Sequence, residues 1–157
     1  MNIRSIKRSD FSTISAVLND WWGGRQMADM LPKLFFDHFS NTSFLAQKDG
    51  EMIGFLVGFL SQSNPDEAYI HFAGVQPEYR KQGIGQLLYR SFFQTVQDFD
   101  RSFVRCITSP VNQGSIAYHT KMGFEIVPGN NMMEGIPVHS DYDGIGKDRV
   151  LFIKKLS

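Results

Sequence analysis

Two glycines and two cations stand together where an apolar run gives way to an amphipathic helix. Arg80 and Lys81 are followed closely by Gly83 and Gly85. Glycine lets the backbone approach a ligand closely, and the first N–H groups of a helix have no partner within the helix. The helix dipole also favours an anion at that end. The segment therefore predicts a site for a phosphate or pyrophosphate group.

Two other phosphate-binding motifs do not match this segment. The dinucleotide fingerprint needs a third glycine three residues after Gly85, where this chain has Leu88. The P-loop needs Gly-Lys followed by Ser or Thr, but Gly83 and Gly85 are followed by Ile84 and Gln86. What remains is an Arg-x-x-Gly-x-Gly motif, preceded by Val-x-Pro-x-Tyr.

A second motif follows later in the chain. It consists of Asn112 and a helical run that carries Tyr118 and ends at Gly123-Phe124. Together the two motifs resemble the GNAT superfamily of N-acetyltransferases, in order over residues 3–124. The resemblance implies an α/β fold of the α+β type. Its mixed, mostly antiparallel central sheet would be splayed between the fourth and fifth strands and flanked by helices. Two ordinary strand–turn–helix units are the structural alternative.

The resemblance also implies acetyl-CoA as the cofactor. We expect the backbone N–H groups of Gln82 to Gly85 to face its pyrophosphate, while Arg80 and Lys81 add positive charge. Asn112 would bond the amides of the pantetheine arm. The expected cofactor-binding residues are Val75, Arg80, Lys81, Gln82, Gly83, Ile84, Gly85, Asn112 and Ser115. A solvated basic turn ended by glycine is the alternative.

Transfer of an acetyl group to an amine needs a base, because an alkylammonium has a pKa of about 10. Glu67, Tyr69 and His71 alternate along a predicted strand, so their side chains share one face. His71 has a suitable ordinary pKa, and Glu67 could act through a water molecule. A purely structural His71 is the alternative.

Two further roles are implied by the resemblance. The backbone N–H of Val75 would polarise the thioester carbonyl, and Gly74 is compatible with a bulge that frees this N–H. Tyr118 would protonate the leaving thiolate; packing of its ring on the core is the alternative. Cys106 is interpreted as a small core residue, because a nucleophilic thiol needs an electropositive, partly exposed site.

The resemblance also implies an acceptor site near the first helices, where bulky aromatic side chains could shape an apolar slot. A core tryptophan and a surface arginine are the alternative. Arg25 could bind a carboxylate on the acceptor. The expected acceptor-binding residues are Trp22, Arg25, Tyr69 and Asp141.

A long loop is predicted over residues 128–147, where it would form a lid that meets Arg25 above the acceptor. Stabilisation of local turns by Asp141 and Asp143 is the alternative. A calcium loop is rejected, because its twelfth position, counted from Asp141, is Phe152 instead of glutamate. No metal site is expected.

The composition limits the classes of function. The chain has 157 residues and a hydrophobic fraction of 42%, which predicts a single globular domain over residues 1–157. The resemblance implies that this is an N-acetyltransferase domain. Its 16 basic and 16 acidic residues balance, so nucleic-acid binding is not expected. The single cysteine excludes an internal disulfide and fits a cytoplasmic location. Neither a signal peptide nor a membrane-spanning run is expected.

The rest of the pattern supplies the elements that must position these residues. The first helix is expected to be capped by Ser9 or Asp10 and stopped by Gly23-Gly24. A helical stretch limited by Pro32 is expected over 26–38, and further helices over 84–98 and 115–122. Strands are expected over 3–7, 43–47, 51–61, 67–75, 101–108, 124–127 and 149–154.

The function that this sequence predicts is an N-acetyltransferase. It would transfer an acetyl group from acetyl-CoA to a primary amine of a small molecule, by direct attack in a ternary complex. A non-catalytic acyl-CoA-binding module and a protein N-acetyltransferase are the alternatives. The expected partner is a small-molecule amine, with no nucleic acid and no membrane, and a homodimer is left open.

Overall fold

The computed structural model describes residues 1–157 as two compact units that share one strand. Unit 1 comprises Met1–Leu60 and Ile70–Asp100, and unit 2 comprises Ser61–Tyr69 and Arg101–Ser157. The boundary falls inside strand β4, Glu67–Val75. Each unit therefore takes part of the strand that leads to the glycine-rich loop.

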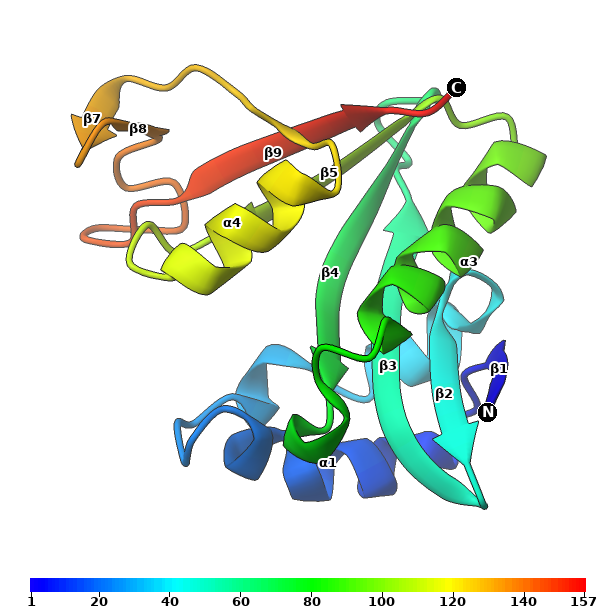
Figure 1. Cartoon of the computed structure of the whole chain (residues 1–157). Coiled ribbons are helices and arrows are strands. Elements are labelled where there is room, and N and C mark those ends of the chain that lie inside the picture. The colour runs from blue at the N-terminus through cyan, green and yellow to red at the C-terminus, as the bar shows by residue number, and fades with distance from the viewer. The chain divides into compact units, whose positions relative to one another are not determined.

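The strands form one seven-stranded sheet in the order β1-β2-β3-β4-β5-β9-β6, and β7 and β8 form a separate pair (Figure 1). The large sheet is mostly antiparallel, and β4 and β5 are its one parallel pair. That parallel pairing joins Glu67–Tyr69 to Phe103–Arg105. The predicted fold class, a mixed and mostly antiparallel sheet flanked by helices, is confirmed.

Unit 1 contains four strands and three α-helices, with short 3₁₀ turns between them. Besides its part of β4, it holds β1 (Asn2–Ser5), α1 (Asp10–Trp21), η1 (Ala28–Met30), α2 (Leu34–His38), η2 (Ser40–Thr42), β2 (Phe44–Lys48), β3 (Glu51–Leu60), η3 (Pro77–Tyr79) and α3 (Ile84–Asp98).

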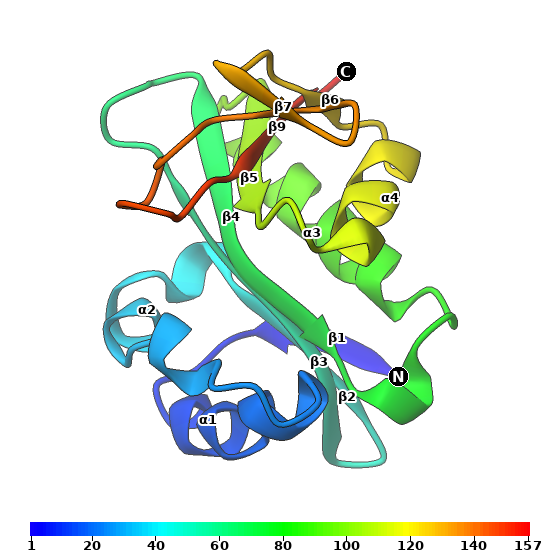
Figure 2. The same ribbon diagram turned by 90° about the vertical axis from the view of Figure 1, so that its left-hand side faces the viewer.

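The sheet of unit 1 is covered by helices on both faces. Gly54 and Phe55 are neighbours in β3, so they point to opposite faces. Phe55 stacks on Trp21 of α1, whereas Ile84 and Leu88 of α3 fill the space beyond Gly54. Thus α1 and α2 cover one face and α3 covers the other (Figure 2).

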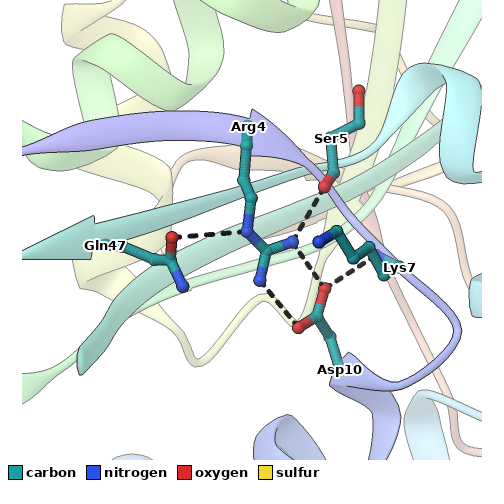
Figure 3. Close-up of polar contacts among 5 residues, drawn as sticks. All are labelled: Arg4, Ser5, Lys7, Asp10 and Gln47. Atoms are coloured by element: carbon teal, nitrogen blue, oxygen red, sulfur yellow. Dashed lines mark hydrogen bonds and ion pairs between the residues drawn. The ribbon is translucent and has the colours of Figure 1, made fainter. Parts of the chain in front are cut away.

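An ion pair between Arg4 and Asp10 fixes the start of α1 (Figure 3). The two terminal nitrogens of Arg4 donate to the two carboxylate oxygens of Asp10, over 2.8 and 2.9 Å. The N–H of Lys7 donates to the same carboxylate over 2.7 Å. Burial would raise the pKa of Asp10, but these hydrogen bonds outweigh it, and the pKa is lowered. Of the two predicted caps, Asp10 makes these contacts, whereas Ser9 makes no side-chain cap.

Unit 2 contains the first residues of β4, one α-helix and five further strands. These elements are β5 (Phe103–Thr108), α4 (Gln113–Lys121), β6 (Glu125–Ile126), β7 (Asn131–Met133), β8 (Ile136–Val138) and β9 (Val150–Lys155). Arg101 holds the turn before β4, because its guanidinium donates to the backbone carbonyls of Ser61, Asn64 and Glu67.

Two stretches differ from their predicted form. The helix predicted over 26–38 is divided into η1 and α2, with Pro32 between them, because proline removes a helical donor and clashes with the preceding turn. The loop predicted over 128–147 contains the β7–β8 hairpin, so a wholly irregular loop was wrong. The hairpin turns at Glu134 and Gly135, which both have positive φ. No helix combines the length and apolar character that a membrane crossing requires.

Candidate functional site

The loop before α3 presents an open helix N-terminus. Lys81 and Gly83 have φ values of 64° and 82°. Gly83 occupies the N-cap position, no side chain caps the helix, and the first turn holds no acidic residue. A Cβ atom added at Gly83 would meet nothing within 4 Å. Ile84 is buried and leaves only its N–H for a ligand. Uncapped donors with room beside them fit an anion such as pyrophosphate.

The cations of this loop have different surroundings. Arg80 donates from Nε to the carbonyl of Val75 over 3.1 Å, and from a terminal nitrogen to the carbonyl of Trp21 over 2.7 Å. Its guanidinium therefore ties the end of β4 to the end of α1. Gln82 donates to the carbonyl of Glu78 within the same turn. Lys81 is exposed, and no protein group pairs with its ammonium.

His71 of β4 is held by the segment before α2. Its Nε2 atom donates to the backbone carbonyl of Met30 over 2.6 Å, and its ring stacks on Phe35 with the centroids 4.2 Å apart. Because that carbonyl only accepts, the neutral ring carries its proton on Nε2 and keeps the lone pair on Nδ1. Burial lowers the pKa of His71, although the bond to Met30 opposes this. The neutral form, which can accept a proton, therefore dominates at pH 7.

Trp22 packs against the last part of β4. Its ring meets Phe72 edge to face, with 4.9 Å between the centroids. A Cβ atom at Gly74 would lie 2.6 Å from the Trp22 ring, so glycine is required there by close packing. Arg25, in contrast, is exposed, and its side chain has no protein partner.

Glu67 and Tyr69 line a cavity of about 290 Å³ in unit 2. Glu67 forms an ion pair with Arg105 of β5, with 2.9 Å between Oε1 and Nε. Tyr142, from the segment after β8, lines the same cavity. Burial raises the pKa of Tyr69, so its phenol is neutral at physiological pH.

Helix α4 carries the residues of the second motif. Asn112 caps the helix, because its Oδ1 atom accepts the N–H of Ser115 over 3.1 Å. The carbonyl of Ser115 accepts from Nδ1 of His119 over 2.8 Å. Tyr118 is half-buried, and burial raises the pKa of its phenol.

The acidic residues after β8 are engaged locally. Asp141 accepts the N–H of Gly146 over 2.7 Å, and Asp143 forms an ion pair with Arg149 at 2.9 Å. Both contacts stabilise the turn that carries Tyr142 toward the cavity. Cys106 is buried within β5, and burial raises the pKa of its thiol, which agrees with a core role. The chain has no group of three or more potential metal ligands.

The sequence interpretation missed Arg105, the partner of Glu67, and Tyr142, which also lines the cavity. Arg105 is the one charged residue of β5, and it lies between buried Val104 and Cys106. That position was a usable signal. The contact of His71 with the backbone carbonyl of Met30 could not be predicted in this way, because every residue type has a backbone carbonyl.

The predicted site residues divide between the two units. Unit 1 holds Trp22, Arg25, His71, Val75, Arg80, Lys81, Gln82, Gly83, Ile84 and Gly85. Unit 2 holds Glu67, Tyr69, Asn112, Ser115, Tyr118 and Asp141.

Comparison with known proteins gives a family match over most of the chain. Residues 6–124 match the family described as the acetyltransferase (GNAT) family.

Two curated relatives share part of the sequence. The L-2,4-diaminobutyric acid acetyltransferase of Nocardia farcinica (strain IFM 10152) is 30% identical over 79 residues, which are 50% of this chain and 41% of that protein. The enzyme of the same name from Virgibacillus pantothenticus is 30% identical over 106 residues, 62% of this chain and 64% of that protein. The chain thus spans less than two thirds of either relative in these matches.

A solved structure shares the fold over the whole chain. It is a GNAT-family protein from Desulfovibrio desulfuricans, with a TM-score of 0.81 and 15% identity, and the match covers 99% of both chains. At that identity the likeness concerns the fold alone.

Proposed function

The chain belongs to the GNAT family of acetyltransferases, and on this premise we propose that it is an N-acetyltransferase for a small molecule. It transfers an acetyl group from acetyl-CoA to a primary amine by direct attack in a ternary complex. The observation that carries this proposal is the uncapped N-terminus of α3 behind the Arg80-x-x-Gly83-x-Gly85 motif. Residues 1–157, both units included, act as one functional domain.

Acetyl-CoA, when bound, supplies the thioester whose carbonyl carbon the amine attacks. The N–H groups of Ile84 and Gly85 bind its pyrophosphate, and Lys81 adds a positive charge. Arg80 acts indirectly, because its bonds to two backbone carbonyls fix the loop. Asn112 caps α4 with its oxygen, so its Nδ2 donors remain for a pantetheine amide.

The reaction forms an N–C bond as the C–S bond breaks, and the ammonium form of the acceptor loses two protons. His71 takes one proton at Nδ1, which Met30 leaves as the lone-pair nitrogen. Glu67 acting through water is the alternative base, but its ion pair with Arg105 favours His71. The backbone N–H of Val75 polarises the thioester carbonyl. The phenol of Tyr118 would protonate the departing thiolate, and the second proton lost by the nitrogen would restore the phenol.

The names of the two curated relatives support a small amino acid as acceptor. L-2,4-diaminobutyric acid is therefore the first amine to test. A small cavity beside Glu67 also favours a small acceptor over a protein chain.

The test is thiol release from acetyl-CoA by the purified chain, with a panel of diamino acids, diamines, aminoglycosides and peptides as acceptors. We expect turnover with at least one small amine, at a rate well above hydrolysis without acceptor. Calorimetric binding of acetyl-CoA with no turnover on any amine would contradict the proposal and favour a non-catalytic module. Turnover on peptides alone would favour a protein acetyltransferase.

A further inference from the structure

The cavity in unit 2 is lined by one acidic side chain, one basic side chain and several aromatic rings. Its volume of about 290 Å³ is just below the range of about 300–1,000 Å³ that is typical of sites for drug-sized ligands, so it suits a smaller molecule. Glu67 and Arg105 line it side by side, and Asn64, Tyr69, Tyr142 and Phe152 contribute to its walls. A ligand of this size that matches the lining carries an ammonium and a carboxylate of its own.

The ion pair leaves binding atoms unused. Arg105 donates to Glu67 through Nε alone, and its two terminal nitrogens have no protein acceptor. Glu67 accepts through Oε1, and its Oε2 atom has no protein donor. The Arg105 side chain is 38% exposed and that of Glu67 is 16% exposed, so the free guanidinium edge is accessible. A closed structural pair would use its fork on both carboxylate oxygens, as Arg4 does on Asp10.

The aromatic walls suit the same ligand. Tyr142 is 49% exposed and is held by the turn that Asp141 and Asp143 stabilise. The faces of Tyr69 and Tyr142 can attract an ammonium group, and their rings also cover an aliphatic stem. Tyr69 remains a neutral donor because burial raises its pKa.

We propose that this cavity binds the head group of a diamino acid, and this step rests on the acetyltransferase function proposed above. The terminal nitrogens of Arg105 hold the α-carboxylate, and Oε2 of Glu67 holds the α-ammonium. In an α-amino acid the carboxylate and the ammonium are attached to the same carbon. They can therefore reach two side chains that lie next to each other, as Arg105 and Glu67 do.

The acceptor must then carry a second amine. A carboxylate beside an ammonium favours its charged form and raises its pKa. The α-amino group held by Glu67 is therefore a poor nucleophile. The acetylated nitrogen is the one at the end of the side chain, so Glu67 is a binding residue and not the base.

The test compares three ligands that differ by one group: L-2,4-diaminobutyric acid, trimethylenediamine, which lacks only the carboxylate, and γ-aminobutyric acid, which lacks only the α-amino group. Calorimetry with CoA present measures affinity, and thiol release measures the acceptor KM. Arg105→Gln should weaken diaminobutyrate binding roughly 10- to 100-fold and leave trimethylenediamine unchanged. Glu67→Gln should weaken diaminobutyrate similarly and leave γ-aminobutyric acid unchanged.

The matched control is Lys121→Gln, which removes an exposed cation of α4 in the same unit and should change no affinity. Melting temperatures confirm that the variants are folded. If Arg105→Gln does not fold, Arg105→Lys keeps the charge but loses the fork, and it should show a smaller loss that is still specific for the carboxylate.

Equal losses for diaminobutyrate and trimethylenediamine in Arg105→Gln would assign the pair a structural role and overturn the proposal. Unchanged affinities in both variants, or no diaminobutyrate binding by the wild-type protein, would overturn it too. The proposed function fails separately. If the variants lose diaminobutyrate affinity as expected but no amine is acetylated, the transferase function is refuted and the cavity assignment stands. If amines are acetylated but the variants bind all three ligands as the wild type does, the cavity assignment is refuted and the transferase function stands.

Discussion

Tyr118 is the proposed general acid, the side chain that protonates the leaving thiolate. Burial raises the pKa of its phenol, so the hydroxyl stays protonated at neutral pH and can donate to a thiolate. The ring also lies edge to face with His119, with 5.6 Å between the centroids. A substitution that keeps the ring therefore separates chemistry from packing.

We expect Tyr118→Phe to lower the rate of acetyl transfer by about 10²–10⁴-fold, because general acid catalysis contributes that much. Acetyl-CoA affinity should change little. Single-turnover measurement isolates the chemical step, and Tyr89→Phe in α3 is the control for loss of a buried hydroxyl elsewhere. A wild-type single-turnover rate would return Tyr118 to a packing role.

At the same scale, Arg80 makes protein contacts that the sequence did not reveal. An arginine beside two glycines predicts a phosphate ligand, yet here its nitrogens bond the carbonyls of Val75 and Trp21. Any residue type offers a carbonyl, so the pattern of side chains could not reveal this. Glu67 and His71 were predictable as candidates from their alternation. Their partners, Arg105 and Met30, depend on tertiary contacts.

Helix α3 and strand β4 have the bounds predicted for them, Ile84–Asp98 and Glu67–Val75. Both have strong periodic signals, since α3 buries one face and β4 alternates buried and half-buried residues. The β7–β8 hairpin escaped prediction because both strands are only three residues long, β7 is fully exposed, and the turn, Glu134-Gly135, lacks the usual Asn-Gly or Asp-Gly pair.

The N-terminus of α3 allows a test of charge with matched shape. Gly83→Asp and Gly83→Asn add nearly identical side chains where there is open space, and both residue types tolerate positive φ. We expect Gly83→Asp to abolish acetyl-CoA binding in calorimetry, because it sets a negative charge against pyrophosphate. Gly83→Asn should lose much less. Similar affinities for the two variants would remove this loop as the anion site.

The cap of α4 allows its stability and binding roles to be separated. Asn112→Ala should lower the free energy of unfolding by about 1 kcal/mol in urea titrations, because the bond to the Ser115 N–H is lost. Asn112→Asp keeps a capping oxygen but removes the Nδ2 donors, so it should retain stability and weaken acetyl-CoA binding. An affinity equal to wild type in Asn112→Asp would limit Asn112 to the cap.

Over the whole molecule, half-buried His71 in unit 1 and buried His119 in unit 2 respond to acid in the same direction. Burial lowers the pKa of His71 in unit 1 and of His119 in unit 2 from the ordinary value of 6.5. Below pH 6.5 the unfolded chain binds protons that the folded chain does not, so stability falls as pH decreases. Above that value both states are neutral, and this contribution is complete.

We therefore expect the free energy of unfolding to drop as the pH falls below about 6.5, by at most about 1.4 kcal/mol per pH unit for each histidine. His71→Gln and His119→Asn keep a donor near the Met30 and Ser115 carbonyls but do not titrate. Each should flatten the slope, and the double variant should flatten it most. A double variant with the wild-type slope would assign the acid response to other groups.

A homodimer and a cytoplasmic location remain predictions.

Strand β4 also sets an order of events during synthesis on the ribosome. All of unit 1 has been made when the chain reaches Asp100, but Glu67–Tyr69 still lacks its parallel partner Phe103–Arg105. The side of this segment that pairs with β5 in the complete sheet is then an open edge, with which other chains can pair. The next residue to emerge is Arg101. We expect its bonds to three carbonyls before and within β4 to hold this segment in place before β5 is complete.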